Sequence, residues 1–285
     1  MAAWLFARSQ GGRFLLRIED LDRQRSRGRW ESEQISDLLT LGVDWDAPPV
    51  RQSERLGLYD EAVTALGAAG RLYPCFCTRT EIREAASAPH DELPEGAYPG
   101  TCRSLSEVQR RARIGGGERF ALRLRAEGER IEFEDRLLGR TGAVVDDFVV
   151  VRSDGIHAYQ LAVVVDDAAQ GVGEVVRGAD LAGSTPRQIL LQRLLGLETP
   201  RYAHVPLVLG GDGRRLAKRD TAAQASRAAP APTAPPAPAA PAATLTWIAH
   251  SLGLAAEREH VANPRELLEC FDPAQIPRDP VRLDG

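Results

Sequence analysis

Three cysteines and a tyrosine lie near one another in the sequence, with Cys75 and Cys77 before a polar loop and Tyr98 and Cys102 after it. Three thiols and a phenol could close a tetrahedral metal site, and thiolates prefer zinc among the common cytosolic ions. Free cysteines are also often small buried apolar residues, and this spacing is less specific than two CxxC pairs. From spacing alone, a zinc site and a buried cluster without metal are equally good interpretations. Cys270 stands apart, and we expect it to be a core residue.

An acidic cluster follows a predicted strand near the start of the chain. The strand covers residues 13–18, and Glu19, Asp20 and Asp22 come directly after it. Strand alternation places Arg17 and Glu19 on the same face. Glu19 would then stand at the carboxyl end of a strand, where ligands bind in open α/β sheets, and its carboxylate could receive an ammonium group. On these residues alone, a solvated acidic turn is the simpler interpretation.

A glycine-rich loop with several cations spans residues 210–219 and contains Lys218, the only lysine among the 36 basic residues. Backbone amides and side-chain donors in such a loop can converge on phosphate groups. A lysine supplies a compact ammonium that a planar guanidinium does not imitate. Two alternatives stand beside this one. The loop could be a basic surface hairpin, and the single lysine could be an accident of an arginine-rich composition.

Composition limits the class of protein. The 285 residues are 43% apolar and 27% charged, which is typical of a globular protein with a substantial core. The net charge of −4 excludes a protein that coats nucleic acid through an overall basic surface, so an RNA partner would need a local patch. Four cysteines are too few for a disulfide scaffold, and neither an apolar run of ~20 residues nor a secretory leader is visible. We expect a monomeric cytoplasmic protein without membrane contact.

The elements that must position these residues alternate along the chain. Helices are expected over residues 30–41, 53–69, 105–114, 157–166 and 185–195, and strands over 13–18, 120–124, 131–133, 147–152, 173–177 and 204–209. Strands separated by helices indicate a parallel sheet built from βαβ units. The predicted sections are a core of residues 1–70 and 147–220, an inserted subdomain of 71–146, a linker of 221–243 and a short helical segment of 244–285. The linker is rich in alanine and proline, which favours extended, disordered chain.

Six motifs taken together resemble the class I glutamyl-tRNA synthetase superfamily. They are Leu16–Asp22 with Arg25, Asp147–Val150, Tyr159–Asp167, Val176–Leu181, Ser184–Gln188 and the KMSKS-like Arg215–Arg219. The resemblance runs from residue 1 to about residue 220. It implies an α/β fold, with a Rossmann-like class I catalytic core and an inserted zinc-containing subdomain. Within the superfamily, the sequence is most similar to the branch that lacks an anticodon-binding domain and glutamylates tRNA(Asp).

The resemblance implies a ligase reaction in two steps. Glutamate attacks the α-phosphorus of ATP, which is used with Mg²⁺, and the glutamyl group then passes to queuosine at the wobble position of tRNA(Asp). By position, Glu19 would bind the substrate ammonium, and Tyr159 and Arg177 would hold glutamate. Lys218 would bind ATP and act in catalysis by neutralising its phosphates. The residues matching the family's structural zinc ligands are Cys75, Cys77, Tyr98 and Cys102.

One part of the family pattern has no match in this sequence. The family opens with a strand and a loop carrying a HIGH-type signature, and the sequence begins after that point, with all five histidines elsewhere. We expect the first strand of the nucleotide-binding sheet to be missing, either through an assigned start too far downstream or through a true loss, and the 285-residue chain to be inactive or nearly so. Two other functions stay open. One is a glutamyl-tRNA synthetase fragment that charges the tRNA 3′ end, and the other is a non-catalytic zinc-stabilised module that binds tRNA or a protein.

Overall fold

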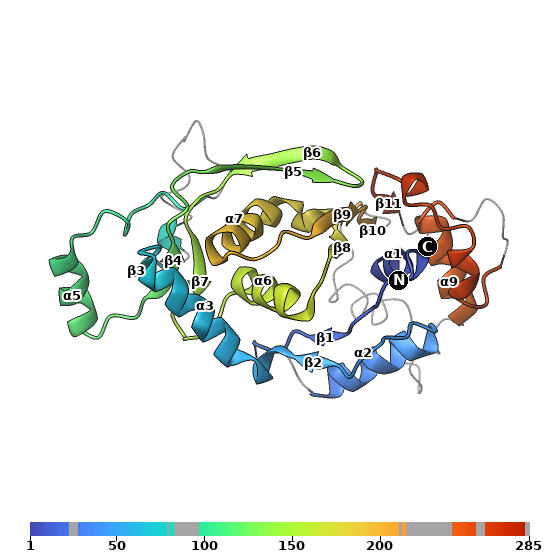
Figure 1. The fold of residues 1–285 in the computed structure, drawn as a ribbon, viewed down its shortest axis with the longest axis horizontal. Helices are drawn as coiled ribbons and strands as arrows, with labels where there is room; N and C mark the ends of the chain where they lie inside the picture. The colour runs from blue at the N-terminus through green and yellow to red at the C-terminus, as the bar shows by residue number, and fades with distance from the viewer. Residues whose placement is uncertain are drawn as a thin grey trace, which may run out of the picture.

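The computed structural model describes residues 1–22, 28–78, 80–82, 97–210, 213–214, 241–254 and 260–282 (Figure 1). Its helices are α1 Ala2–Ser9, α2 Gly28–Thr40, α3 Leu56–Ala68, α5 Glu107–Gly115, α6 Tyr159–Gln170, α7 Thr185–Leu195, α9 Pro241–Ser251 and α10 Arg265–Leu268. Its strands are β1 Arg17–Ile18, β2 Val50–Arg51, β3 Leu72–Cys75, β4 Ala121–Leu124, β5 Arg130–Asp135, β6 Gly139–Val144, β7 Phe148–Val151, β8 Glu174–Gly178, β9 Arg201–Val205, β10 Val208–Leu209 and β11 Val281–Arg282. Short 3-10 turns include η1 Gln52–Glu54 and η2 Ala179–Ser184. None of the described helices is long and apolar enough to cross a membrane.

The largest sheet has four strands in the order β6-β5-β9-β8. Strand β9 runs parallel to both β8 and β5, and β6 forms an antiparallel hairpin with β5. A second, antiparallel sheet has the order β3-β4-β7, and two parallel pairs join β1 to β2 and β10 to β11. The expected α/β fold is confirmed, and parallel pairing joins β1 to β2, β9 to β8 and β5, and β10 to β11.

Strand pairing crosses the boundary that the sequence predicts at residue 146. Strands β5 and β6 belong to the predicted insert, but they extend the β9-β8 sheet of the core. Strand β7 belongs to the predicted core, but it pairs with β4 in the other sheet. The two sections are therefore interlocked by backbone hydrogen bonds, which neither periodicity nor composition reports.

The strand predicted over residues 13–18 is a strand only at β1, its last two residues. The prediction was wrong for residues 13–16. Within the described part of the chain, β1 pairs with β2 alone and β8 pairs with β9 alone. A cavity of about 470 Å³ lies between the segment before β1, helix α1 and the start of β8, and its lining includes Phe14, Leu15, Gly173 and Val176. Because no described strand spans that space, β1 and β8 do not join into one sheet.

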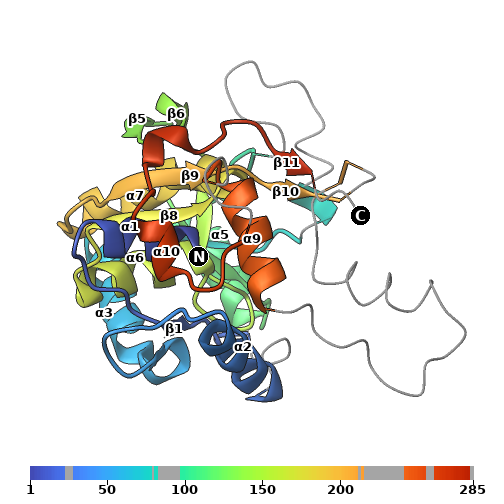
Figure 2. The same cartoon turned by 90° about the vertical axis from the view of Figure 1, so that its right-hand side faces the viewer.

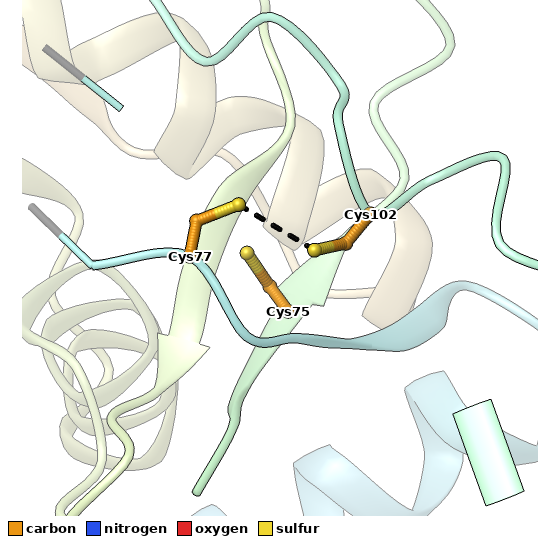
Figure 3. Close-up of side chains that lie close together, drawn as sticks. All are labelled: Cys75, Cys77 and Cys102. Atoms are coloured by element: carbon orange, nitrogen blue, oxygen red, sulfur yellow. Dashed lines mark hydrogen bonds between the residues drawn. The ribbon is translucent and has the colours of Figure 1, made fainter. Parts of the chain in front are cut away.

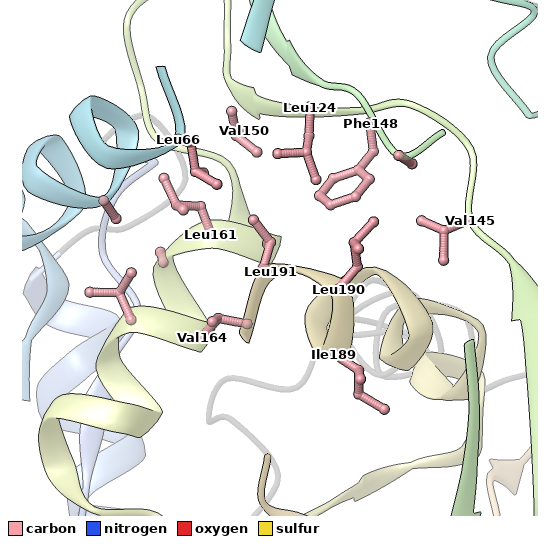
Figure 4. Close-up of a cluster of buried hydrophobic side chains, with 14 of the residues drawn as sticks. Leu66, Leu124, Val145, Phe148, Val150, Leu161, Val164, Ile189, Leu190 and Leu191 are labelled. Atoms are coloured by element: carbon pink, nitrogen blue, oxygen red, sulfur yellow. The ribbon is translucent and has the colours of Figure 1, made fainter. Parts of the chain in front are cut away.

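The main core lies where α3, α6 and α7 meet the strands. Most apolar positions of α6 and α7 are buried, among them Leu161, Val164 and Leu191 (Figure 4). Leu124 of β4 and Phe148 of β7 complete the cluster from the antiparallel sheet. Burying a side chain of this size contributes roughly 1.5–3 kcal/mol each relative to exposure. The main core therefore joins both sheets into one body.

A second core lies around the N-terminal helix. Trp4 and Leu5 of α1 are completely buried against Leu245 of α9 and Leu267 of α10. Figure 2 shows α9 and α10 beside α1, which joins the two ends of the described chain. The partly buried Cys270 packs at the edge of this cluster, as expected for a core residue. Helix α9 begins at Pro241, inside the last three residues of the predicted linker, and residues 221–240 lie outside the described part.

Helix ends follow local chemistry closely where a suitable residue is present. Helix α7 has the predicted bounds, with Pro186 in its first turn and Gly196 ending it at φ 66°. Helix α6 continues four residues past its predicted end at Asp166 and stops at Gly171, also at φ 66°. The left-handed conformation that closes the helix is adopted by Gly171, the first glycine after the predicted end.

Asp166 is a completely buried carboxylate on the otherwise apolar face of α6. It accepts hydrogen bonds from Gln52 Nε2 (2.9 Å), Arg55 Nε (2.6 Å) and Tyr59 Oη (2.8 Å). Arg17 of β1 forms an ion pair with it, with Nε 3.8 Å from Oδ2. A buried charge is tolerated only with such partners. Asp166 therefore fixes β1, η1 and α3 against α6.

We expect Asp166→Asn to lower the free energy of unfolding by about 3–5 kcal/mol, because it breaks a pair whose carboxylate is completely buried and leaves the partly buried Arg55 without its charge partner. Chemical denaturation followed by circular dichroism measures this. Glu107→Gln is the control, because Glu107 forms an exposed pair with Arg111 on α5 and such pairs contribute little. Equal denaturation midpoints for the two variants would contradict the role of Asp166.

Candidate functional site

The three residues assigned to glutamate by resemblance come together in the fold. Glu19 directly follows β1, Tyr159 is the first residue of α6, and Arg177 lies near the end of β8. Tyr159 lies beside Arg177 and within electrostatic range of Glu19, and both affect its pKa. The carboxyl ends of β1 and β8 thus meet at one place, which is where ligands bind in open α/β sheets.

Neighbouring side chains hold the end of β1 in position. Arg17 Nη1 donates to Asp167 Oδ1 at 2.7 Å, and Arg17 Nη2 donates to Glu19 Oε1 at 3.5 Å. On the other side, Asp20 accepts hydrogen bonds from the backbone N–H and the hydroxyl of Ser53, at 2.8 and 2.6 Å. Glu19 is therefore placed by anchored residues on both sides, while its own side chain stays exposed and able to take a ligand.

Arg177 is held by neutral partners. Its Nε donates to His204 Nε2 at 3.1 Å, and its Nη2 donates to Thr185 Oγ1 at 2.8 Å. Among the described residues, no carboxylate oxygen lies within the 4.0 Å of an ion pair with Arg177. A fixed, partly buried guanidinium without a carboxylate in ion-pair range among the described residues is suited to a carboxylate from outside, which an arginine fork can bind with two hydrogen bonds.

The local charges affect the two ionisable groups beside Arg177. Desolvation raises the pKa of the Tyr159 phenol, with the positive charge of Arg177 opposing it and Glu19 adding to it. Tyr159 is therefore a neutral hydroxyl at pH 7, able to donate to a substrate oxygen. Desolvation also raises the pKa of Asp167, although the charge of Arg17 and a hydrogen bond from it oppose the rise.

The three cysteines and Tyr98 also converge, at the end of β3. The sulfur atoms of Cys75, Cys77 and Cys102 all lie within 4.8 Å of one another and point inward (Figure 3). Tyr98 Oη is 3.4 Å from the sulfur of Cys75 and 3.7 Å from that of Cys77, and the sulfurs of Cys77 and Cys102 are 3.5 Å apart. No pair of them forms a disulfide.

These separations fit a tetrahedral zinc ion. With Zn–S bonds of about 2.3 Å and Zn–O bonds of about 2.1 Å, tetrahedral geometry requires S···S and S···O separations of about 3.8 and 3.6 Å. Three thiols and one oxygen at such distances leave room for a single ion. Burial opposes ionisation of Cys75, but its hydrogen bonds with Tyr98 and Arg123 outweigh it and hold its pKa below the usual value. Burial raises the pKa of Cys77 to about 12 in the absence of a metal. Zinc binds the thiolate, so a thiol that ionises readily is a suitable ligand.

Two buried aspartates join this cluster to the core. Asp146 accepts the backbone N–H of Tyr98 at 3.0 Å and the Nε–H of Arg187 from α7 at 2.9 Å. Asp147 accepts the hydroxyl of Tyr73 on β3 at 2.7 Å. The cysteine cluster is therefore tied to helix α7, whose first residue, Thr185, contacts Arg177. The two sites share one supporting helix.

Lys218 lies outside the described residues, so its role stays a prediction from the sequence. The described start of its loop is closed by a hydrogen bond from the N–H of Gly210 to the C=O of Arg214, at 2.8 Å.

Sequence reasoning missed the supports of Arg177, namely Thr185, His204 and Asp135. In the sequence these residues are a helix start, a strand residue and an acid in the predicted insert, and no spacing links them. Only the register of β8 with β9, which pairs Arg177 with His204, brings them together.

The chain is similar to known proteins over most of its length. The family model for tRNA synthetases class I (E and Q), catalytic domain, matches residues 1–240. A Nocardia farcinica protein named glutamyl-Q tRNA(Asp) synthetase is 53% identical over 280 residues, which are 98% of this chain and 85% of that protein. A protein of the same name from Symbiobacterium thermophilum is 48% identical over 295 residues, covering 99% of this chain and 89% of the other.

Among solved structures, a glutamate tRNA ligase from Elizabethkingia meningosepticum in complex with its amino acid is similar with a TM-score of 0.78 and 25% identity. The match covers 99% of this chain but only 62% of that ligase, so the chain spans less than two thirds of its length. The ends of β1 and β8, the residues gathered there and these similarities lead to one conclusion. The chain belongs to the class I tRNA synthetases (E and Q), and residues 1–240 match their catalytic domain.

Proposed function

We propose that the protein activates L-glutamate with ATP and transfers it to queuosine in tRNA(Asp). The observation that carries this proposal is Arg177, a positioned cation with no carboxylate partner among the described residues. The relatives named glutamyl-Q tRNA(Asp) synthetase support it, because they are about half identical over almost the whole chain. We assign the activity to the cytoplasm, where tRNA and ATP are present.

The charges of the site match those of glutamate. At neutral pH the amino acid carries two carboxylates and one ammonium group. Arg177 binds the side-chain carboxylate through its fork, and the neutral Tyr159 donates to one of its oxygens. The exposed carboxylate of Glu19 receives the ammonium group. The α-carboxylate is left free to attack ATP.

The first step joins that carboxylate to the α-phosphorus of ATP and releases pyrophosphate. Negative charge builds on the phosphates as this bond forms, so fixed cations accelerate the step. Lys218, in the glycine-rich loop, neutralises the phosphates, and Mg²⁺ accompanies ATP as part of the substrate. In the second step, a hydroxyl on the cyclopentene ring of queuosine attacks the glutamyl carbonyl, and AMP leaves.

The cysteine cluster holds a structural zinc ion in this proposal. Cys75, Cys77 and Cys102 supply thiolates and Tyr98 completes the shell, as their separations allow. The ion stabilises the loops at the end of the β3-β4-β7 sheet, which we assign to an inserted subdomain. It takes no part in the chemistry.

The site of transfer is tested with tRNA(Asp) that contains queuosine but lacks its 3′-terminal adenosine, and with tRNA(Asp) that has an intact 3′ end but no queuosine. The protein, expressed with any coding sequence upstream of Met1, is incubated with ATP and labelled glutamate. We expect label on the first tRNA only, because the acceptor is the modified base. Label on the second tRNA only would support the alternative of charging at the 3′ end, and label on neither would favour a non-catalytic module.

We expect Arg177→Ala to weaken glutamate binding about 10- to 100-fold while leaving ATP binding unchanged, because a hydrogen bond to a charged group is lost. Titration calorimetry with each ligand measures both. Arg193→Ala is the matched control, because Arg193 lies on α7 and pairs with the exposed Glu129. Unchanged glutamate affinity in Arg177→Ala would remove the residue from the site.

We expect about one zinc ion per chain in the purified protein, and its loss in Cys75→Ser with Cys102→Ser, because two of the four ligands are removed. Elemental analysis and a chromogenic chelator measure the metal. Cys270→Ser should retain it, since Cys270 packs in the other core. Full zinc content in the double variant, or none in the unaltered protein, would contradict the assignment.

A further inference from the structure

A chain of buried polar contacts crosses the four-stranded sheet behind Arg177. Asp135 ends β5, His204 lies on β9, and Arg177 lies on β8 as the register partner of His204. Asp135 Oδ2 is 2.6 Å from His204 Nδ1, and His204 Nε2 is 3.1 Å from Arg177 Nε. The side chains of Asp135 and His204 are completely buried, so this connection is shielded from water.

The carboxylate of Asp135 is well satisfied. Its Oδ1 accepts the backbone N–H groups of Leu137, Leu138 and His204, at 2.9–3.2 Å. Burial works to raise the pKa of Asp135, but the hydrogen bonds from His204, Leu138 and Leu137 outweigh it and hold the pKa below its usual value. An ionised carboxylate only accepts hydrogen bonds, so the nitrogen facing it, His204 Nδ1, carries the proton.

A neutral imidazole protonated at Nδ1 has its lone pair at Nε2. That lone pair faces the Nε–H of Arg177 and the hydroxyl of Thr185, which is 3.2 Å away. Thr185 in turn accepts from Arg177 Nη2 at 2.8 Å. Two of the five N–H groups of the guanidinium are thus fixed on one side, and the rest of the fork is available to Tyr159 and a ligand. The other tautomer would set two N–H donors against each other.

We propose that Asp135 and His204 are positioning residues for substrate recognition: Asp135 selects the Nδ1–H tautomer of His204, and His204 then aims the Arg177 fork at the side-chain carboxylate of the amino acid. The inference rests on the proposed function for the identity of that ligand. It makes the β5-β6 hairpin part of the binding machinery, because Asp135 is the last residue of β5.

Stability alone does not require a buried charge at this place. Burying the carboxylate of Asp135 costs free energy that its hydrogen bonds must offset, whereas apolar side chains of similar volume carry no such cost. The surroundings here are apolar and aromatic, with the ring of Tyr202 stacked on His204 at 6.1 Å and that of Phe133 packed edge-on at 6.4 Å. The hydrogen-bonded chain from Asp135 to His204 fixes the orientation of Arg177, and apolar side chains in the same places would not.

The tautomer is measured directly by nuclear magnetic resonance on protein labelled with ¹⁵N at histidine. The signal of His204 is the one among five that His204→Gln removes. We expect Nδ1–H in the unaltered protein. Asp135→Asn keeps an oxygen for the three backbone N–H groups but turns an amide N–H₂ toward His204, so the signal should change to Nε2–H, as when an amide replaces the carboxylate of a hydrolase triad. An Nε2–H tautomer in the unaltered protein would overturn the proposal.

Binding of L-glutamate and of ATP is then compared by calorimetry. We expect Asp135→Asn and His204→Ala to weaken glutamate binding about 10-fold or more and to leave ATP binding unchanged. His204→Gln should retain affinity within about threefold, because its amide oxygen can accept from Arg177 Nε. Adding Asp135→Asn to His204→Gln should cause little further loss, since no tautomer is left to select. Asp154→Asn, which removes an exposed partner of Arg152, is the control for charge.

These outcomes separate this inference from the proposed function. If the protein transfers glutamate to queuosine but Asp135→Asn switches the tautomer without changing glutamate affinity, only the inference fails. If the tautomer and the glutamate affinities behave as expected but no glutamate reaches queuosine, only the acceptor assignment fails. Should Asp135→Asn not fold, the tautomer of the unaltered protein and the contrast between His204→Ala and His204→Gln decide. Equal losses in those two variants would overturn the proposal.

Discussion

Asp166 places a negative charge inside the apolar face of α6, and the position of several other elements follows from how that charge is satisfied. Water does not reach it, so its partners must come from the protein. They come from β1, η1 and α3, which are distant in the sequence. Because Tyr159 begins α6 and Glu19 follows β1, satisfying Asp166 also sets the separation of two residues of the candidate site. A requirement of the core thus determines the geometry of the surface above it.

The cation of that site depends on a second constraint, the parallel register of β8 with β9. An arginine side chain has many rotamers, and holding one of them costs conformational entropy. Here His204 and Thr185 supply acceptors at fixed positions on a strand and a helix end, so Arg177 is oriented before any ligand binds. Preorganisation of this kind lowers the cost of binding. The hairpin from the predicted insert takes part in this arrangement through Asp135, which lies 2.6 Å from His204.

Local chemistry predicted a large part of this fold. Helix α7 has its expected bounds because Pro186 favours a first turn and Gly196 takes the left-handed conformation. The cluster around Cys75 was expected from the resemblance to the family, and the structure brings its three cysteines together. Strand pairing was harder to predict. Residues 13–16 have strand-like alternation, but only Leu16 bonds to a described strand, where its C=O accepts the N–H of Val50 at 3.1 Å. Strand β7 has the alternation of a core strand but pairs with β4. Alternation reports which face is buried and not which strand lies alongside.

Residue types and their order determined which chemical groups this protein has: the thiols of one cluster, the acidic end of β1 and the arginine of β8. They also determined the alternation of helices and strands that carries these groups. The family match assigns these groups to a class I synthetase catalytic domain. Tertiary structure decided which of these side chains come into contact. Asp135 and His204 are 69 residues apart and share no motif, yet Asp135 Oδ2 lies 2.6 Å from His204 Nδ1, behind Arg177. Their contact depends on the order of strands in the sheet. Packing and hydrogen bonding over the whole chain set that order, so no local sequence pattern predicts it.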